Sequence, residues 1–137
     1  MPRSLPVRLT TSQEKQLQQM AAQLGVSPEE FLATLVGEKL REESFPHIEF
    51  RTRGGSRDAY LQGHRLAVWE IARITRDLDG EPPLCADYLH LPLHLVEAAL
   101  SYANAYPDEI QALIEEVEAI TVEDLKRLIP SLIVYEG

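Results

Sequence analysis

A stretch of alternating apolar and polar residues near the start of the chain limits what this protein can fold into. Its apolar positions are Leu5, Val7 and Leu9. Period-two alternation is typical of a strand with one buried face. No second early strand follows, and so short a strand cannot bury its apolar side alone. We therefore expect residues 4–10 to pair antiparallel with a second copy. The chain would then be an obligate homodimer or a higher even oligomer.

Two helix start signals follow this stretch. Thr11 with Glu14, and Ser27 with Glu30, have the spacing of a capping box, and a proline follows Ser27. Gly25 is expected to end the first helix in the left-handed conformation. The apolar positions recur at helical spacing, at Leu17, Met20, Ala21 and Leu24 and then at Phe31, Leu32, Leu35, Val36 and Leu40. Two helices of about 13 residues are marginal alone, which again favours a dimer.

This first part of the chain, residues 1–44, resembles the ribbon-helix-helix repressors and antitoxins. The likeness rests on Leu5-Pro6-Val7-Arg8-Leu9-Thr10, on the cap at Thr11, and on Leu24-Gly25-Val26-Ser27-Pro28-Glu29-Glu30-Phe31-Leu32. In that family the paired strands enter the major groove of DNA. The resemblance implies that Ser4, Pro6 and Arg8 face the bases, and that Val26, Ser27 and Pro28 clamp a phosphate at the helix N-terminus. We expect Arg3 to contribute mostly attraction to phosphate.

An alternative use of this unit stays open. Pro6 offers nothing to a base edge, and Glu29 and Glu30 put negative charge beside the expected phosphate. The same ribbon could therefore serve dimerisation alone, in a protein-interaction module that binds no DNA.

The central stretch, residues 45–118, is similar to an antitoxin-associated family, the domain of unknown function numbered 433. Its motifs read Phe45-Pro46-His47-Ile48, Gly63-His64-Arg65-Leu66-Ala67-Val68, Ala98-Ala99-Leu100-Ser101-Tyr102-Ala103 and Tyr106-Pro107-Asp108-Glu109-Ile110. The resemblance implies a small helical bundle related to helix-turn-helix domains. It also implies a neighbouring toxin that resembles the PIN-type ribonucleases.

The residues themselves give a compatible order of elements. Alternation at 48–53, a Gly54-Gly55-Ser56 turn and a second strand at 59–61 predict a hairpin. Five short helices follow, separated or started by Gly80, Pro82, Pro92, Pro107 and Thr121, and residues 131–135 read as a final extended segment. The predicted fold class is mainly α: a ribbon-helix-helix in a swapped dimer, a small β-hairpin and a helical helix-turn-helix-like bundle. The expected divisions are 1–44, 45–118 and 119–137.

Charge is distributed unevenly. The net charge is -9, yet residues 1–80 hold 11 basic and 11 acidic side chains, whereas residues 81–137 hold 2 and 11. Arginines gather at the hairpin, where Arg51, Arg53 and Arg57 suit backbone phosphates because guanidinium matches phosphate bidentately. Ion pairing to the acidic C-terminal half of the same chain is the equal alternative.

The end of the chain is unusually apolar for a terminus. Leu132, Ile133, Val134 and Tyr135 follow an acidic region. Chain ends are usually polar and frayed unless docked. We expect these four residues to bind a basic partner, with docking on the protein's own core as the alternative.

Catalytic and metal chemistry find little support. His90 and His94 are four apart, but Pro92 between them makes a shared helix face improbable. Cys85, the single cysteine, suits a small core residue, and the acids of 108–124 suit a solvated face. Neither a phosphate loop nor a dinucleotide fingerprint is present. We expect no enzyme activity, no cofactor and no metal.

Taken together, the sequence predicts a cytoplasmic bacterial antitoxin. It would bind operator DNA as a dimer and neutralise a ribonuclease-like toxin. A lone cysteine fits a reducing compartment, and neither a secretory signal nor a membrane-spanning run is evident.

Overall fold

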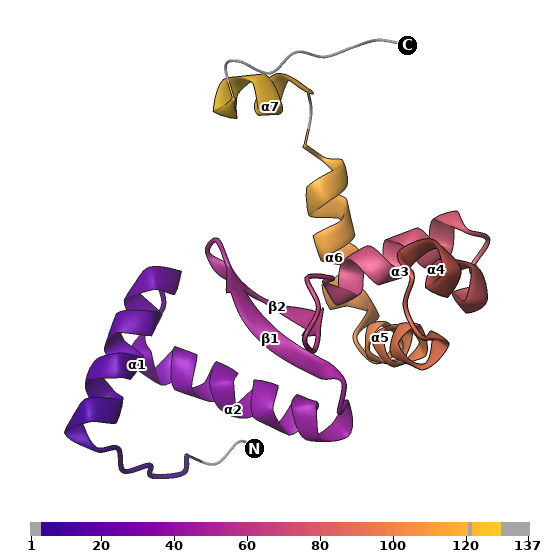
Figure 1. The fold of residues 1–137 in the computed structure, drawn as a ribbon. Coiled ribbons are helices and arrows are strands. Elements are labelled where there is room, and N and C mark those ends of the chain that lie inside the picture. Colours follow the sequence, from indigo (N-terminus) through magenta and orange to yellow (C-terminus); the bar gives the residue numbers. More distant parts are fainter. Residues whose placement is uncertain (1–3, 121, 130–137) are drawn as a thin grey trace.

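The computed structural model describes residues 4–120 and 122–129, which form helices and one small sheet (Figure 1). The helices are α1 (Thr11–Leu24), α2 (Pro28–Ser44), α3 (Val68–Asp77), α4 (Pro82–Leu89), α5 (Leu93–Ala105), α6 (Pro107–Glu118) and α7 (Val122–Leu128). The sheet is an antiparallel hairpin of β1 (Ile48–Arg53) and β2 (Ser56–Leu61). The mainly α prediction with a small hairpin is therefore confirmed.

Helix α1 has its cap one residue earlier than expected. Thr10, not Thr11, is the N-cap: its side chain accepts from the Gln13 backbone N–H at 3.1 Å, and Gln13 Oε1 accepts from the Thr10 N–H at 2.9 Å. The predicted box of Thr11 with Glu14 is thus wrong by one position. Two adjacent threonines, each followed three residues later by Gln or Glu, satisfy the capping pattern equally well.

The link from α1 to α2 follows the prediction. Gly25 ends α1 with φ 69°, the left-handed region that glycine tolerates at little cost. Ser27 caps α2 by accepting from the Glu30 N–H at 3.1 Å, and Pro28 takes the first helical position. Helix α2 is 17 residues long, longer than the expected 13 or so, and runs on beside the hairpin.

The hairpin turns at Gly54-Gly55 as predicted, but Ser56, which was expected in the turn, begins β2, so that strand starts earlier than the predicted residue 59. Ile48 pairs with Leu61 and Arg53 with Ser56, and Gly54 in the connection has φ 59°. Alternate residues therefore face opposite sides, so Arg51 and Arg53 share one face, as the alternation predicted.

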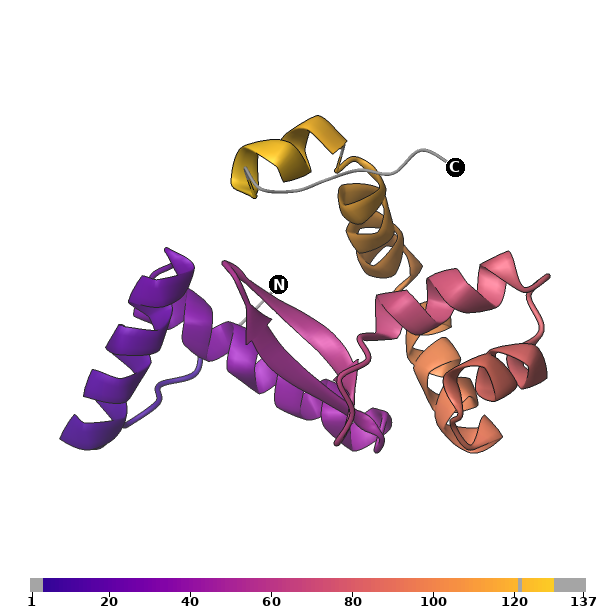
Figure 2. The same cartoon turned by 45° about the horizontal axis from the view of Figure 1, so that its top comes forward.

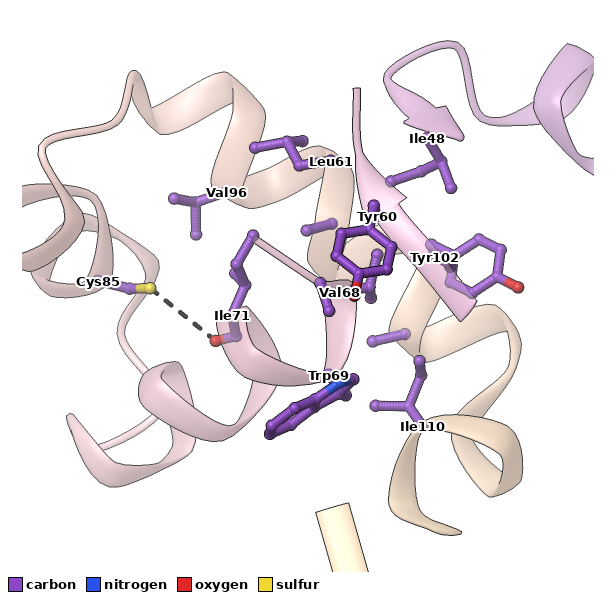
Figure 3. Packing of buried hydrophobic residues seen from close by; sticks show 14 of the residues in the cluster. Ile48, Tyr60, Leu61, Val68, Trp69, Ile71, Cys85, Val96, Tyr102 and Ile110 are labelled. Carbon is purple, nitrogen blue, oxygen red and sulfur yellow. Dashed lines mark hydrogen bonds between the residues drawn. The ribbon is translucent and has the colours of Figure 1, made fainter. Parts of the chain in front are cut away.

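The hydrophobic core is drawn from the hairpin and the helices that follow it (Figure 3). Leu61, Val68, Ile71, Val96 and Tyr102 are among its fully buried side chains. Cys85 also lies in this core, with its sulfur 3.9 Å from the Ile71 carbonyl oxygen, as expected for a small core residue.

Figures 1 and 2 show the order of the parts in space. Helices α1 and α2 lie on one side, the hairpin runs along α2, and α3 to α6 form a bundle on the other side. Helix α7 stands apart from the bundle beyond the end of α6. Across residues 4–120 and 122–129, every helix is too short or too polar to cross a lipid bilayer.

Candidate dimerisation and nucleic-acid surface

Residues 4–10, the predicted ribbon, form an irregular segment leading into α1 in the single chain. Their apolar side chains face solvent: Leu5 is 81% exposed, Val7 59% and Leu9 37%. A ribbon strand needs the strand of a second copy, so the swapped dimer stays a prediction.

Two shallow hollows lie where the ribbon segment meets α1 and α2. One, of about 340 Å³, includes Val7, Leu9, Leu17 and Leu32 in its lining. The other, of about 260 Å³, shares Leu9, Leu17 and Leu32. The alternating apolar side chains and the helical apolar faces thus border the same open space, which remains unfilled in one copy.

The N-terminal unit buries very little by itself. Within residues 4–44, only Ala21, Phe31 and Glu38 are buried. Val36 and Leu40, one helical turn apart in α2, are both more than half exposed. A unit of this size with two buried apolar side chains has almost no core of its own.

The predicted DNA contacts of the ribbon are the residues that alternate with its apolar positions. Ser4, Pro6 and Arg8 are all exposed, and Arg3 lies outside the described residues. Arg8 could therefore meet a base edge if the ribbon forms, since guanidinium pairs bidentately with guanine.

The predicted phosphate clamp has few free donors. Val26 and Ser27 are exposed and Pro28 is half-buried. Pro28 has no N–H, and the Glu30 N–H is already taken by Ser27, so the Glu29 N–H is the main first-turn donor left. The carboxylates of Glu29 and Glu30 lie in the same turn and oppose an anion.

Arg57 is held by α2 in a two-point ion pair. Its Nη2 lies 2.6 Å from Glu38 Oε1, its Nε lies 3.1 Å from Glu38 Oε2, and its Nη1 donates to Thr52 at 3.1 Å. Both charged side chains are largely buried. Arg57 therefore fastens the hairpin to α2.

Arg51 and Arg53 cover aromatic rings on the other face of the hairpin. Arg51 pairs with Glu49 and lies over Tyr60, with its guanidinium carbon 4.8 Å from the ring centre. Arg53 lies 3.6 Å from a carboxylate oxygen of Asp58 and 5.7 Å from the Trp69 ring centre. The hairpin arginines thus find carboxylate partners within the chain. Those partners come from α2 and the hairpin, and not from the acidic C-terminal half, which the sequence left open as one of two alternatives.

A buried carboxylate lies beneath Arg53. Asp58 has an almost fully buried side chain, and burial raises its pKa above the usual value, with the charge of Arg53 acting in the opposite direction. Asp58 Oδ2 and the Trp69 indole N–H both lack a hydrogen-bond partner among the described residues. Asp58 Oδ2 instead has the ion pair with Arg53 at 3.6 Å, and Asp58 Oδ1 accepts from the Ser56 hydroxyl at 3.3 Å.

A polar cluster joins α2 to the bundle, and sequence reasoning missed it. Arg41 donates to the Tyr102 hydroxyl at 2.8 Å and to Glu109 at 2.9 Å, and Tyr102 donates to Glu109 at 2.6 Å. The guanidinium also stacks 4.0 Å from the Tyr106 ring centre. Burial, aided by Glu109, raises the pKa of Tyr102 well above its usual range. Burial alone would lower the pKa of Arg41, but its bonds to Glu109 and Tyr102 outweigh that and raise it.

Arg57 and Arg41 both line a cleft of about 430 Å³ between α2, the hairpin and α6. Glu38 and Arg57 lie in its lining, as do Arg41 and Glu109. The cleft therefore marks the joint at which the N-terminal unit is fixed to the rest of the chain.

The four histidines lie at different places in the fold. His90 ends α4 in the left-handed conformation and His94 lies in α5, so they share no helix, as predicted. The His47 and His94 rings lie 5.7 Å apart, but residues 4–120 and 122–129 contain no cluster of three or more metal-ligating side chains. Leu132, Ile133, Val134 and Tyr135, the predicted partner-binding tail, lie outside the described residues.

The chain matches no known protein family, no curated protein and no solved structure.

Proposed function

We propose that this protein is a dimeric DNA-binding antitoxin, which represses its own promoter and neutralises a toxin resembling a PIN-type ribonuclease. The observation that carries the proposal is the exposed alternation of Leu5, Val7 and Leu9 beside the open apolar hollows of α1 and α2. Pairing two copies through these residues would cover that surface and create a two-stranded ribbon. The opposite face of such a ribbon would carry Ser4, Pro6 and Arg8 toward the major groove.

The helix arrangement is compatible with this use. Capping by Thr10 starts α1 directly after the ribbon segment, and the Gly25 turn brings α2 back against it. The ion pairs of Arg57 with Glu38 and of Arg41 with Glu109 hold α2 against the hairpin and the bundle. A DNA-binding N-terminal unit would therefore be joined firmly to the acidic part of the chain.

That acidic part supports a basic partner. Residues 81–137 carry 11 acidic and 2 basic side chains, and α6 exposes Asp108, Glu115 and Glu116 along its surface. A ribonuclease must have a basic channel for its substrate, and opposite charge speeds association with such a surface. Cytoplasmic location and the absence of catalytic activity belong to this proposal.

The direct test is a binding titration of the purified protein on its own upstream DNA and on a random duplex of equal length. Repression predicts tighter binding to the upstream DNA, and affinity that falls steeply as salt rises, because phosphate contacts release counterions. Equal, weak binding to both duplexes would contradict the DNA-binding half.

Removal of residues 130–137 tests the toxin-binding half. We expect the shortened chain to fold and bind DNA but to lose toxin neutralisation. Neutralisation that survives the deletion, or a chain that unfolds, would show that the tail is not the toxin clamp.

A second candidate, a dimeric interaction module that binds no DNA, is favoured by one observation. The Glu29 and Glu30 carboxylates and the Pro28 ring stand where a phosphate would bind. This candidate predicts a stable dimer together with failure of the DNA titration.

A further inference from the structure

The three arginines of the hairpin are held to different degrees. Each guanidinium nitrogen of Arg57 donates to a neighbouring side chain, and Arg51 donates through two nitrogens to Glu49. Arg53 has one carboxylate contact, a 3.6 Å distance from its Nε to Asp58 Oδ2, which is longer than a good hydrogen bond. Its side chain is 47% exposed. Arg53 is therefore the hairpin arginine that can turn toward an outside anion with the least loss.

The turn beside Arg53 offers further donors. Residues 52–56 are all exposed, and Arg53 is the one charged side chain among them. Within residues 4–120 and 122–129, the backbone N–H groups of Gly54 and Gly55 have no hydrogen-bond partner. Gly55 is outside the left-handed region, so the turn itself does not require a glycine there. The space where its Cβ would lie is open, which leaves room for an acceptor to approach the backbone closely.

This combination of donors fits a phosphate group. Guanidinium and free backbone N–H groups are donors that proteins commonly present to nucleic-acid phosphates. In Figures 1 and 2 the turn lies at the end of the hairpin away from the α3–α6 bundle, on the side of the molecule where α1 lies. That is also the side of the proposed ribbon, since residues 4–10 lead into α1.

We propose that Arg53 and the Gly54-Gly55 turn bind a phosphate of the DNA backbone, and that Asp58 restrains Arg53 in the free protein. The Asp58 side chain is 3% exposed and lies against the guanidinium, so its carboxylate competes with a phosphate for the same cation. The proposal rests on the DNA-binding function and adds a contact outside the ribbon. Arg51 and Arg57, which the sequence grouped with Arg53, stay in their ion pairs.

A titration of the full-length protein with a random DNA duplex tests the contact. Removing Arg53 alone would leave the buried Asp58 carboxylate without its cation. The main comparison is therefore between Asp58→Asn and the double variant Arg53→Ala/Asp58→Asn, neither of which carries that carboxylate. We expect the double variant to bind about fivefold more weakly, as for the loss of one exposed ion pair, and its salt slope to fall by about one.

Two matched controls separate a local contact from a general effect of charge. Arg65→Ala, made in the Asp58→Asn chain, removes an exposed arginine that follows the other end of the hairpin. Asp87→Asn removes an exposed carboxylate of α4. Asp58→Asn by itself should tighten binding relative to wild type by about twofold or more, because the phosphate loses its competitor, and this gain should disappear in the double variant.

Two results would overturn the proposal. Equal losses of affinity for the Arg53 and Arg65 variants would show that only net charge matters. A gain with Asp58→Asn no larger than the gain with Asp87→Asn would show that Asp58 does not restrain Arg53.

The amide NMR signals of Gly54 and Gly55 give a local readout that does not depend on the ribbon. They should shift as duplex is added to the wild-type protein and stay in place in Arg53→Ala/Asp58→Asn. Inorganic phosphate at the same phosphate concentration should move them less, and equal shifts would assign the turn to the free anion and overturn the DNA contact. Shifts without preference for the upstream DNA would support the turn and count against the ribbon. Preference for the upstream DNA with unmoved glycine signals would overturn this contact alone.

Discussion

Arg57 of the hairpin and Glu38 of α2 form a two-point ion pair, with N–O distances of 2.6 and 3.1 Å, that fastens the N-terminal helices to the hairpin. The side chains are 18% and 10% exposed, so each depends on the other for its charge to be tolerated. Removing one partner would leave an uncompensated, largely buried charge.

We therefore predict that Arg57→Ala lowers the free energy of unfolding by about 3 kcal/mol or more, as measured by urea denaturation. Arg57→Lys should recover only part of this loss, because an ammonium cannot form the two-point contact. Lys39→Ala is the matched control, since its pair with Glu43 is highly exposed and worth about 0–1 kcal/mol. If Arg57 serves DNA instead, Arg57→Ala would weaken DNA binding and leave stability unchanged.

The sequence allowed prediction of those features that depend on neighbours along the chain. Gly25 and Pro28 mark the link between α1 and α2, and the Gly54-Gly55 pair marks the hairpin turn, because glycine and proline restrict the backbone locally. The cap at Thr10 was missed by one residue, since the neighbouring threonine satisfies the same pattern.

The candidate site could be predicted less completely, because its key contacts join distant residues. Arg41 meets Tyr102 and Glu109, which lie 61 and 68 positions later. Arg57 resembled a phosphate ligand, since the sequence does not show that Glu38 faces it from α2. Glu38 follows Phe31 and Leu35 at helical spacing, seven and three residues after them. This places the glutamate on the same face of α2 as two apolar side chains, a weak signal that it is covered.

Val7→Asp tests whether the ribbon segment joins two copies. In a paired ribbon the aspartate would be buried without a partner, so we expect the micromolar dimer to dissociate or unfold. Light scattering coupled to size-exclusion chromatography gives the mass. Ser4→Asp places the same charge on the opposite strand face and should leave the dimer intact. A wild-type chain that is a folded monomer at micromolar concentration would contradict the prediction.

Asp58 should make stability depend on pH. Burial raises its pKa above 3.8, so the folded protein holds the proton more tightly than the unfolded chain does. The folded state therefore gains stability as pH falls through the window just above 3.8, and ionised Asp58 lowers stability at neutral pH.

Asp58→Asn removes the charge at every pH and keeps the shape of the side chain. Relative to wild type, we expect the variant to be more stable at pH 7 than at pH 4, that is, to have the larger gain in free energy of unfolding at pH 7. Urea denaturation at both pH values measures the difference. Asp87→Asn, on the exposed surface of α4, controls for the loss of one carboxylate. A relative stability that moves the other way would show that the pair with Arg53 outweighs burial.

Arg8 and Arg3 should differ in what they contribute to DNA binding. Arg8 lies at an outward position of the alternating segment, so in a ribbon it would reach base edges, where a bidentate contact discriminates by about 1–3 kcal/mol. Arg3 precedes the alternating residues and should act mainly through its charge on the phosphates. Arg8→Ala is therefore expected to weaken binding to the operator far more than to random duplex. Arg3→Ala should weaken binding to both duplexes by a similar factor and flatten the salt dependence.

Fluorescence anisotropy titrations of both variants on both duplexes measure these effects, with circular dichroism to confirm that each variant folds. If both substitutions have the same effect on both duplexes, Arg8 reads no base, and the ribbon binds DNA only through attraction to the phosphates.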